Sequence, residues 1–135
     1  MQEAIEYTSG CKSMVLNLAI SYGSRSEIVD AVRSIGRRIA DGGLEPGEVD
    51  EDTISEHLYT GGLVDPDLLI RTSGEMRISN FLLWQIAYTE LYFSDVLWPD
   101  FRNADFYDAL VDFQQRERRF GKISAQVKDE SVKRN

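Results

Sequence analysis

Two arginines and a serine within nine residues carry the groups that bind a small oxyanion. They are Arg71, Arg77 and Ser79, and a Thr-Ser-Gly-Glu stretch directly follows Arg71. The planar guanidinium group of arginine matches phosphate oxygens two at a time, while hydroxyl and backbone N–H groups satisfy the oxygens that remain. The spacing therefore predicts an oxyanion site. The alternative is that both arginines are solvated, or paired with Glu75 and Glu90.

A buried strand is expected to place Arg71 at its carboxyl end. Residues 67–72 are short and mostly apolar, and residues 14–20 predict a second buried strand of the same kind. Between them, an apolar repeat over residues 28–39 predicts a helix that stops at the glycine pair 42–43. Strand, helix and strand in this order form a βαβ unit and predict a parallel sheet. Ligands of such sheets bind outside the carboxyl ends of the strands.

The other predicted elements are shorter or lie further along the chain. Ser24 or Ser26 is expected to cap the first helix, and Asn80 either shapes the loop after Arg71 or caps a helix beside Ser79. The remaining expectations are a second helix from 52 or 53 to about 61, a short helix over 79–88, a strand over 90–94, an amphipathic helix from 105 to about 119 and a mobile polar tail over 122–135.

The composition is that of an ordinary globular domain. The 135 residues carry a net charge of −8, which argues against a nucleic-acid backbone as partner and favours a small anionic ligand for the local arginines. The one cysteine, Cys11, excludes an internal disulfide, so a reducing, cytoplasmic location is expected. No apolar run reaches the length of a transmembrane helix, and the acidic start is unlike a signal peptide.

The order of residues around Arg71 resembles the signature of the cis-prenyltransferases. The resemblance covers about 27 consecutive positions, residues 67–93, and is far more specific than a lone glycine motif. Three further stretches resemble the same family, and the matches together span roughly residues 14–121. They are 16–25, where Ser21 and Ser24 replace the Asn and second Gly of the family's usual Asn-Tyr-Gly-Gly-Arg, 95–101 and 116–121.

The resemblance implies an α/β fold with a mostly parallel sheet flanked by helices, the C-terminal part of a cis-prenyltransferase fold. Residues 1–121 would form this partial domain. Enzymes of this family condense isopentenyl diphosphate onto an allylic diphosphate such as farnesyl diphosphate, and make a cis double bond at each addition. The bacterial-style motifs favour an undecaprenyl diphosphate product, a lipid that would bring the protein near the membrane surface.

The resemblance also implies roles for individual residues. Arg71, Arg77 and Ser79 would bind the diphosphate of isopentenyl diphosphate. Glu90 would help to hold Mg²⁺, a hard cation that suits one carboxylate together with diphosphate oxygens and water. No residue is assigned as catalytic, since the metal and the arginines would act mainly by positioning and by offsetting charge.

The end of the matched region points to a homodimer. Arg119 and Gly121 match the family's Arg-x-Gly ending, which reaches toward the substrate site of the partner subunit. An aromatic-rich region over residues 81–101 also favours self-association.

One family motif has no match in the 135 residues, the Asp-Gly-Asn-x-Arg-Trp loop of the allylic-substrate site. Without its upstream neighbours, the fold is expected to leave an exposed sheet edge and an open apolar helix face. Three interpretations follow: a fragment of a full enzyme, a non-catalytic or scaffold subunit of a prenyltransferase complex, or an unrelated α/β anion-binding module. The fragment is the preferred interpretation, and the chain alone is expected to be inactive.

Overall fold

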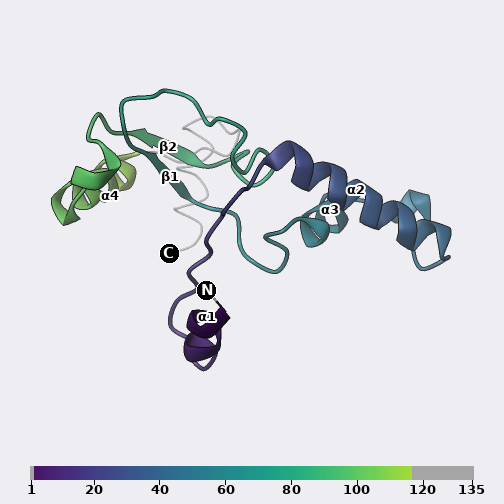
Figure 1. The fold of residues 1–135 in the computed structure, drawn as a ribbon. Coiled ribbons are helices and arrows are strands. Elements are labelled where there is room, and N and C mark those ends of the chain that lie inside the picture. Colours follow the sequence, from purple (N-terminus) through teal and green to yellow (C-terminus); the bar gives the residue numbers. More distant parts are fainter. Residues whose placement is uncertain (1, 117–135) are drawn as a thin grey trace, which may run out of the picture.

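A computed structural model describes residues 2–116 of the chain. This part contains four α-helices and a two-stranded sheet, which lies between α4 on one side and the pair α2 and α3 on the other (Figure 1). The bounds are α1 (Gln2–Thr8), α2 (Ser24–Ala40), α3 (Glu51–His57), β1 (Leu68–Arg71), β2 (Glu90–Phe93) and α4 (Asn103–Gln115), with short 3₁₀ helices at Pro46–Glu48 and Trp98–Asp100. None of the described helices is long and apolar enough to span a bilayer.

The two strands pair in parallel, which confirms the predicted α/β class. Leu68 lies opposite Glu90, and Arg71 lies opposite Phe93. The segment that joins the strands, residues 72–89, is the crossover that a parallel pair requires. It contains turns where a helix was predicted over 79–88, so that prediction is wrong. The physical reason is the left-handed backbone at Ser79, with a φ of 47°, and at its neighbours, which no right-handed helix can contain.

The strand predicted over residues 14–20 is also wrong. These residues run from α1 to α2 as an extended, exposed segment, and among the described residues they pair with no strand (Figure 1). Leu16 is 75% exposed and Ile20 is 62% exposed. An apolar sequence favours a strand, but a strand forms only where its backbone pairs with a neighbour, and these residues leave the outer edge of β1 unpaired among the described residues. The expected free sheet edge is therefore present at β1. Of the expected open apolar helix face, Val29 and Val32 of α2 are exposed.

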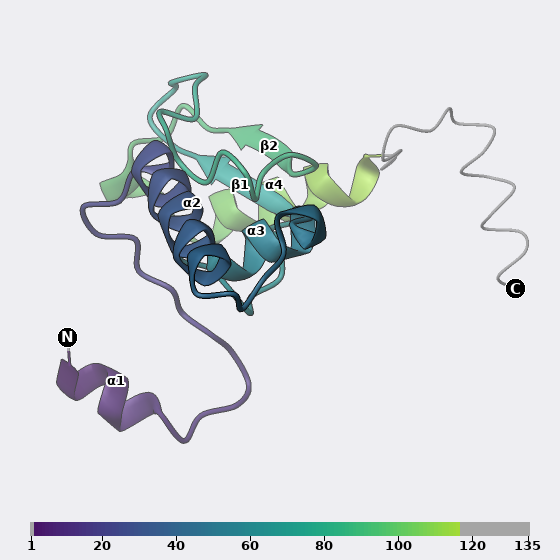
Figure 2. The same ribbon diagram turned by 90° about the vertical axis from the view of Figure 1, so that its right-hand side faces the viewer.

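α2, α3 and α4 begin close to where the sequence predicts, α3 ends earlier than predicted, at His57, and α1 has no counterpart in the prediction. α2 and α3 pack side by side (Figure 2), and α2 turns Ala31 and Ile35 inward while Val32 stays 61% exposed. α3 begins after Asp50, whose carboxylate accepts a hydrogen bond of 2.8 Å from the backbone N–H of Thr53. The predicted helix cap at Ser24 or Ser26 is wrong, because the position before α2 is held by a glycine, Gly23.

A buried carboxylate takes the central place in the small core. Glu27, in the first turn of α2, is fully buried. It accepts hydrogen bonds from the hydroxyl of Tyr22, from the backbone N–H of Tyr59 at 2.9 Å and from the side-chain amide of Gln85 at 3.3 Å. A buried charge is tolerated only where such bonds replace its hydration. Glu27 therefore ties α2 to the end of α3 and to the crossover.

Replacing Glu27 should destabilise the fold more than any exposed acidic residue. Glu27→Ala removes the acceptor of the Tyr59 N–H and one of the two acceptors of the Gln85 amide, which keeps its 2.9 Å bond to Thr60. The loss is expected to cost about 3 kcal/mol in the free energy of unfolding. Urea denaturation followed by circular dichroism measures this loss. The matched control, Glu56→Ala on the exposed face of α3, should leave the midpoint nearly unchanged. Equal midpoints for the two variants would contradict the structural role of Glu27.

Candidate anion-binding site

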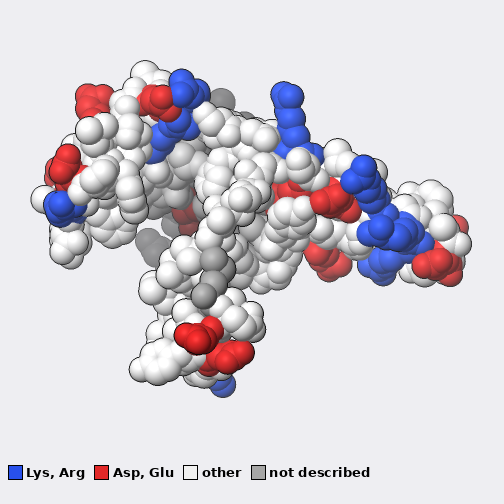
Figure 3. All heavy atoms as spheres, viewed as in Figure 1, with Lys and Arg blue, Asp and Glu red and all other residues white. Residues whose placement is uncertain are grey.

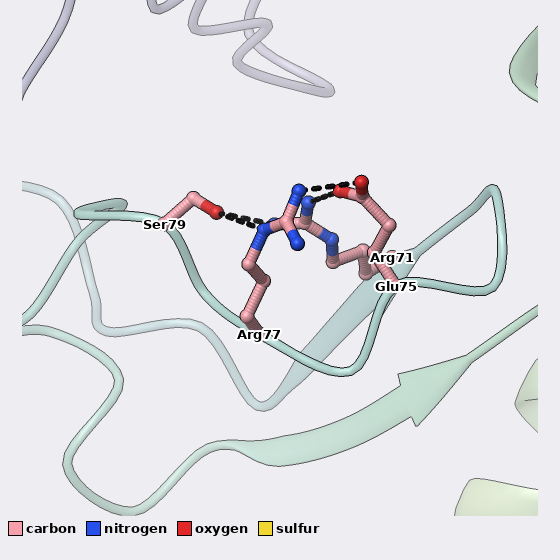
Figure 4. Close-up of polar contacts among 4 residues, drawn as sticks. All are labelled: Arg71, Glu75, Arg77 and Ser79. Carbon is pink, nitrogen blue, oxygen red and sulfur yellow. Dashed lines mark hydrogen bonds and ion pairs between the residues drawn. The ribbon is translucent and has the colours of Figure 1, made fainter.

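Four polar side chains form one closed cluster at the carboxyl end of β1 (Figure 4). The hydroxyl of Ser79 accepts from Nη1 of Arg71 at 3.2 Å and from Nε of Arg77 at 3.1 Å. The carboxylate of Glu75 accepts from Nη2 of Arg71 through one oxygen and from Nη2 of Arg77, at 2.5 Å, through the other. The three residues predicted to bind an anion are thus brought together, with a carboxylate between the two guanidinium groups.

A tight turn after β1 creates this convergence. Ser73 and Gly74 both have left-handed backbone, with φ values of 74° and 70°. Their N–H groups donate 2.9 Å hydrogen bonds to the carbonyl oxygens of Val96 and Ser94, just beyond β2. A side chain at Gly74 would meet the carboxylate of Asp95 at 3.1 Å, so the turn and its surroundings favour glycine. The chain therefore reverses at once, and Arg77 and Ser79 return to the end of β1.

The cluster is half open to solvent and carries net positive charge. The Arg71 side chain is 22% exposed, that of Glu75 42% and that of Arg77 63%. The hydrogen bond from Arg71, together with the positive charge of both arginines, lowers the pKa of Glu75 below its ordinary value. Beside the cluster lies a hollow of ≈ 350 Å³ lined by Arg71, Thr72 and Ser73 among others. It borders Arg71 and Glu75, whereas Arg77 and Ser79 are not among its lining residues.

The alternative that the arginines are paired is confirmed in part. Both arginines do pair with Glu75, as that alternative holds, but neither forms an ion pair with Glu90 among the described contacts. Since Glu75 already sits as an oxyanion between two guanidinium groups, its pairing shows that the arrangement can hold a forked anion. Pairing and anion binding are compatible readings of the same geometry.

Glu90 lies away from this cluster within the chain. It begins β2 opposite Leu68, whereas Arg71 ends β1 three residues later. Side chains alternate along a strand, and residues in register point the same way, so Glu90 and Arg71 face opposite sides of the sheet. Glu90 instead accepts a 3.0 Å hydrogen bond from Arg116 at the end of α4. The hydrogen bond to Glu90 is the main cause that raises the pKa of Arg116, and a second hydrogen bond, to Asp112, raises this pKa further.

The described residues provide no cluster of side-chain ligands for the predicted metal site. Residues 2–116 contain no group of three or more His, Cys, Asp or Glu side chains that could hold a metal ion. The assignment of Glu90 as a metal ligand stays a prediction, as do Arg119 and Gly121, which lie outside the described residues.

A second arginine-rich surface runs along α2. Figure 3 shows basic side chains over this helix with acidic ones between them. Arg33 pairs with Asp30 at 3.2 Å, and both side chains are largely exposed. Such pairs contribute little and are typical of a solvated helix face. The convergence at the end of β1 is therefore the better candidate for a binding site.

Comparison with known proteins assigns the chain to a family. A family model described as "Putative undecaprenyl diphosphate synthase" matches residues 1–121, and the chain belongs to this cis-prenyltransferase family. An isoprenyl transferase of Geobacter sulfurreducens is 56% identical over 131 residues, which are 97% of this chain and 53% of the relative. A farnesyl-diphosphate-specific ditrans,polycis-undecaprenyl-diphosphate synthase of Lactiplantibacillus plantarum is 55% identical over 127 residues, 92% of this chain and 49% of the relative.

The same relationship holds in three dimensions. The crystal structure of lavandulyl diphosphate synthase from Lavandula x intermedia, in complex with dimethylallyl diphosphate, superposes with a TM-score of 0.84 at 45% identity. The match covers 90% of this chain and 54% of that one. The chain therefore spans about half the length of the curated relatives that it matches.

Neutralising Glu75 should strengthen anion binding. In Glu75→Gln, the amide keeps the size of the side chain but removes the negative charge that competes with an incoming anion. Inorganic pyrophosphate, titrated by calorimetry, is expected to bind several-fold more tightly than to the unsubstituted chain. Glu56→Gln makes the same charge change on α3 and serves as control. Unchanged or weaker binding in Glu75→Gln would show that the carboxylate does not compete with the ligand.

Proposed function

We propose that the chain carries the isopentenyl diphosphate site of a cis-prenyl diphosphate synthase. The observation that carries this proposal is the convergence of Arg71, Arg77 and Ser79 at the carboxyl end of β1. Membership of the family supports it, and so does the structural likeness to lavandulyl diphosphate synthase. The reaction would be the repeated condensation of isopentenyl diphosphate onto an allylic diphosphate.

The site would bind the diphosphate by exchange of one anion for another. Arg71, the more buried arginine, would keep its place at the strand end while Arg77, the more exposed, forks onto the ligand. The diphosphate would take over the N–H donors that Glu75 now holds, and the Ser79 hydroxyl would donate to a phosphate oxygen. These contacts orient the acceptor substrate and offset its charge.

The finer features of the enzyme are part of the proposal. We propose an undecaprenyl diphosphate product and a farnesyl diphosphate primer, supported by the name of the Lactiplantibacillus plantarum relative. Three further features stay predictions from the sequence. They are a homodimer in which Arg119 and Gly121 reach the partner's site, a cytoplasmic location, and a lipid product at the membrane surface.

Magnesium is the proposed cofactor, and it would supply positive charge to the diphosphate oxygens. Within one chain, the described residues do not fit an ion shared by Glu90 and a diphosphate at Arg71, because the two side chains face opposite sides of the sheet. No step proposed for the arginine cluster depends on the ion.

Loss of Arg77 should weaken binding of isopentenyl diphosphate. Arg77→Ala removes one guanidinium fork, with an expected loss of about ten-fold or more in affinity measured by calorimetry. Arg77→Lys keeps the charge without the fork, so its affinity should lie between that of the unsubstituted chain and that of Arg77→Ala. Arg33→Ala, on the solvated face of α2, is the matched control. If Arg77→Ala bound isopentenyl diphosphate as the control does, Arg77 would be removed from the site.

The chain by itself is expected to bind substrate without extending it. The 135 residues contain no match to the family's allylic-substrate loop, so one of the two diphosphates would have no family-type site on these residues. Incubation with labelled isopentenyl diphosphate, farnesyl diphosphate and Mg²⁺ should give no polyprenyl product by chromatography. Multi-turnover elongation would refute this expectation and would show that the chain is a complete enzyme.

A further inference from the structure

The loop that carries Ser79 is bonded to the N-terminus of α2, far away in the sequence. The backbone carbonyl of Asn80 accepts a 2.9 Å hydrogen bond from the N–H of Ser24. Its side-chain Oδ1 accepts a 3.0 Å bond from the N–H of Arg25. These are the first two residues of α2, whose N–H groups have no partner within the helix. Gly23, which precedes them, has no side chain with which to cap, so Asn80 caps the helix from 55 residues away.

The contact is reciprocal and closely packed. The hydroxyl of Ser24 accepts a 2.9 Å bond from the N–H of Leu83, and Ser24 is fully buried. A side chain at Gly23 would meet the amide nitrogen of Asn80 at 3.0 Å, which explains why a glycine allows the loop to come this close. Tyr22 adds an edge-to-face contact with Phe81, with ring centroids 5.6 Å apart.

The loop needs this support because its backbone is strained. Ser79, Asn80 and Leu82 all have left-handed φ values, of 47°, 62° and 47°. Most residues with side chains adopt this conformation rarely, and mainly where the surroundings impose it; asparagine is an exception. The conformational cost is higher at Leu82 than at Asn80, since asparagine tolerates left-handed backbone better than leucine does. The bonds of Asn80 to α2 lie in the middle of the strained stretch and hold it.

We propose that Asn80 is a positioning residue for the anion site. By capping α2, it fixes the backbone next to Ser79, so that the Ser79 hydroxyl lies where both Arg71 and Arg77 reach it. Asn80 makes its own described bonds to α2 and acts on the ligand through Ser79. This inference rests on the proposed function of the Arg71, Arg77 and Ser79 cluster, and it adds that helix α2 sets the geometry of that cluster.

A thermodynamic cycle between Asn80 and Ser79 tests the proposal. The 135-residue chain, Asn80→Ala, Ser79→Ala and the double variant are titrated with inorganic pyrophosphate by calorimetry. Each single variant should bind about ten-fold more weakly, and the double variant should bind no more weakly than the weaker single one. This lack of additivity is expected because Asn80 acts through Ser79, and a general loss of stability would not produce it.

Three further variants separate positioning from folding. Asn80→Asp keeps an oxygen acceptor at the helix N-terminus and should restore affinity to within about three-fold of the unsubstituted chain. Asn80→Gly keeps the left-handed backbone and the carbonyl bond to Ser24 but lacks the side-chain bond, so it tests the cap if Asn80→Ala does not fold. Asn103→Ala, at the exposed start of α4, is the matched control and should bind like the unsubstituted chain.

The outcomes distinguish this inference from the proposed function. Weaker binding in Asn80→Ala or Asn80→Gly, restored in Asn80→Asp and non-additive with Ser79→Ala, supports it. Affinity unchanged in both Asn80→Ala and Asn80→Gly, or losses that add in the double variant, overturns it and leaves the proposed function standing if Ser79→Ala and Arg77→Ala still weaken binding. A chain that does not bind pyrophosphate overturns both.

Discussion

The first turn of α2 and the crossover between the two strands depend on each other through hydrogen bonds. The crossover, residues 72–89, has no regular helix or strand, so its polar backbone groups must find partners elsewhere. Ser24 meets part of this need, because its hydroxyl accepts from the N–H of Leu83 and its own N–H donates to the carbonyl of Asn80. Glu27 bonds to the crossover through a side chain, and both residues are fully buried. In return, Asn80 caps the helix, and Gln85 donates to Glu27. Buried hydrogen bonds therefore join α2 to the crossover, a role that apolar packing has in most small cores.

This dependence explains which parts of the structure the sequence could predict. The strands β1 and β2 and the helices α2, α3 and α4 follow from local patterns of apolar residues, caps and glycines, and they begin close to the predicted residues. The cluster of Arg71, Arg77 and Ser79 follows from the position of Arg71 at a strand end and from the family resemblance. The two strongest local signals that failed, over 14–20 and 79–88, are those that tertiary contacts override.

The two failures have different physical causes. Residues 14–20 have the composition of a strand, but a strand also requires backbone pairing with a neighbour, and composition cannot report whether that pairing forms. Residues 79–88 have the pattern of a helix with a serine cap, but their first residues are held in left-handed backbone by α2. The sequence predicts the cap of α2 at Ser24 or Ser26, and for Asn80 it indicates a role in its own loop or as a cap beside Ser79; the contact of Asn80 with α2 has no counterpart in the prediction. A cap supplied across 55 residues leaves no local pattern.

The alternation of side chains along the strands separates two charged clusters. Arg71 faces one side of the sheet with Glu75, Arg77 and Ser79, while Glu90 faces the other with Arg116. The second cluster joins α4 to β2, where Arg116 also donates a 2.9 Å bond to the carbonyl of Leu91. In the first, Glu75 pairs with the two guanidinium groups, and under the proposed function it would hold them in place and also compete with the ligand. Such preorganisation lowers the entropy that binding must offset, and a diphosphate, with more oxygens and more charge than one carboxylate, has the chemistry to displace Glu75.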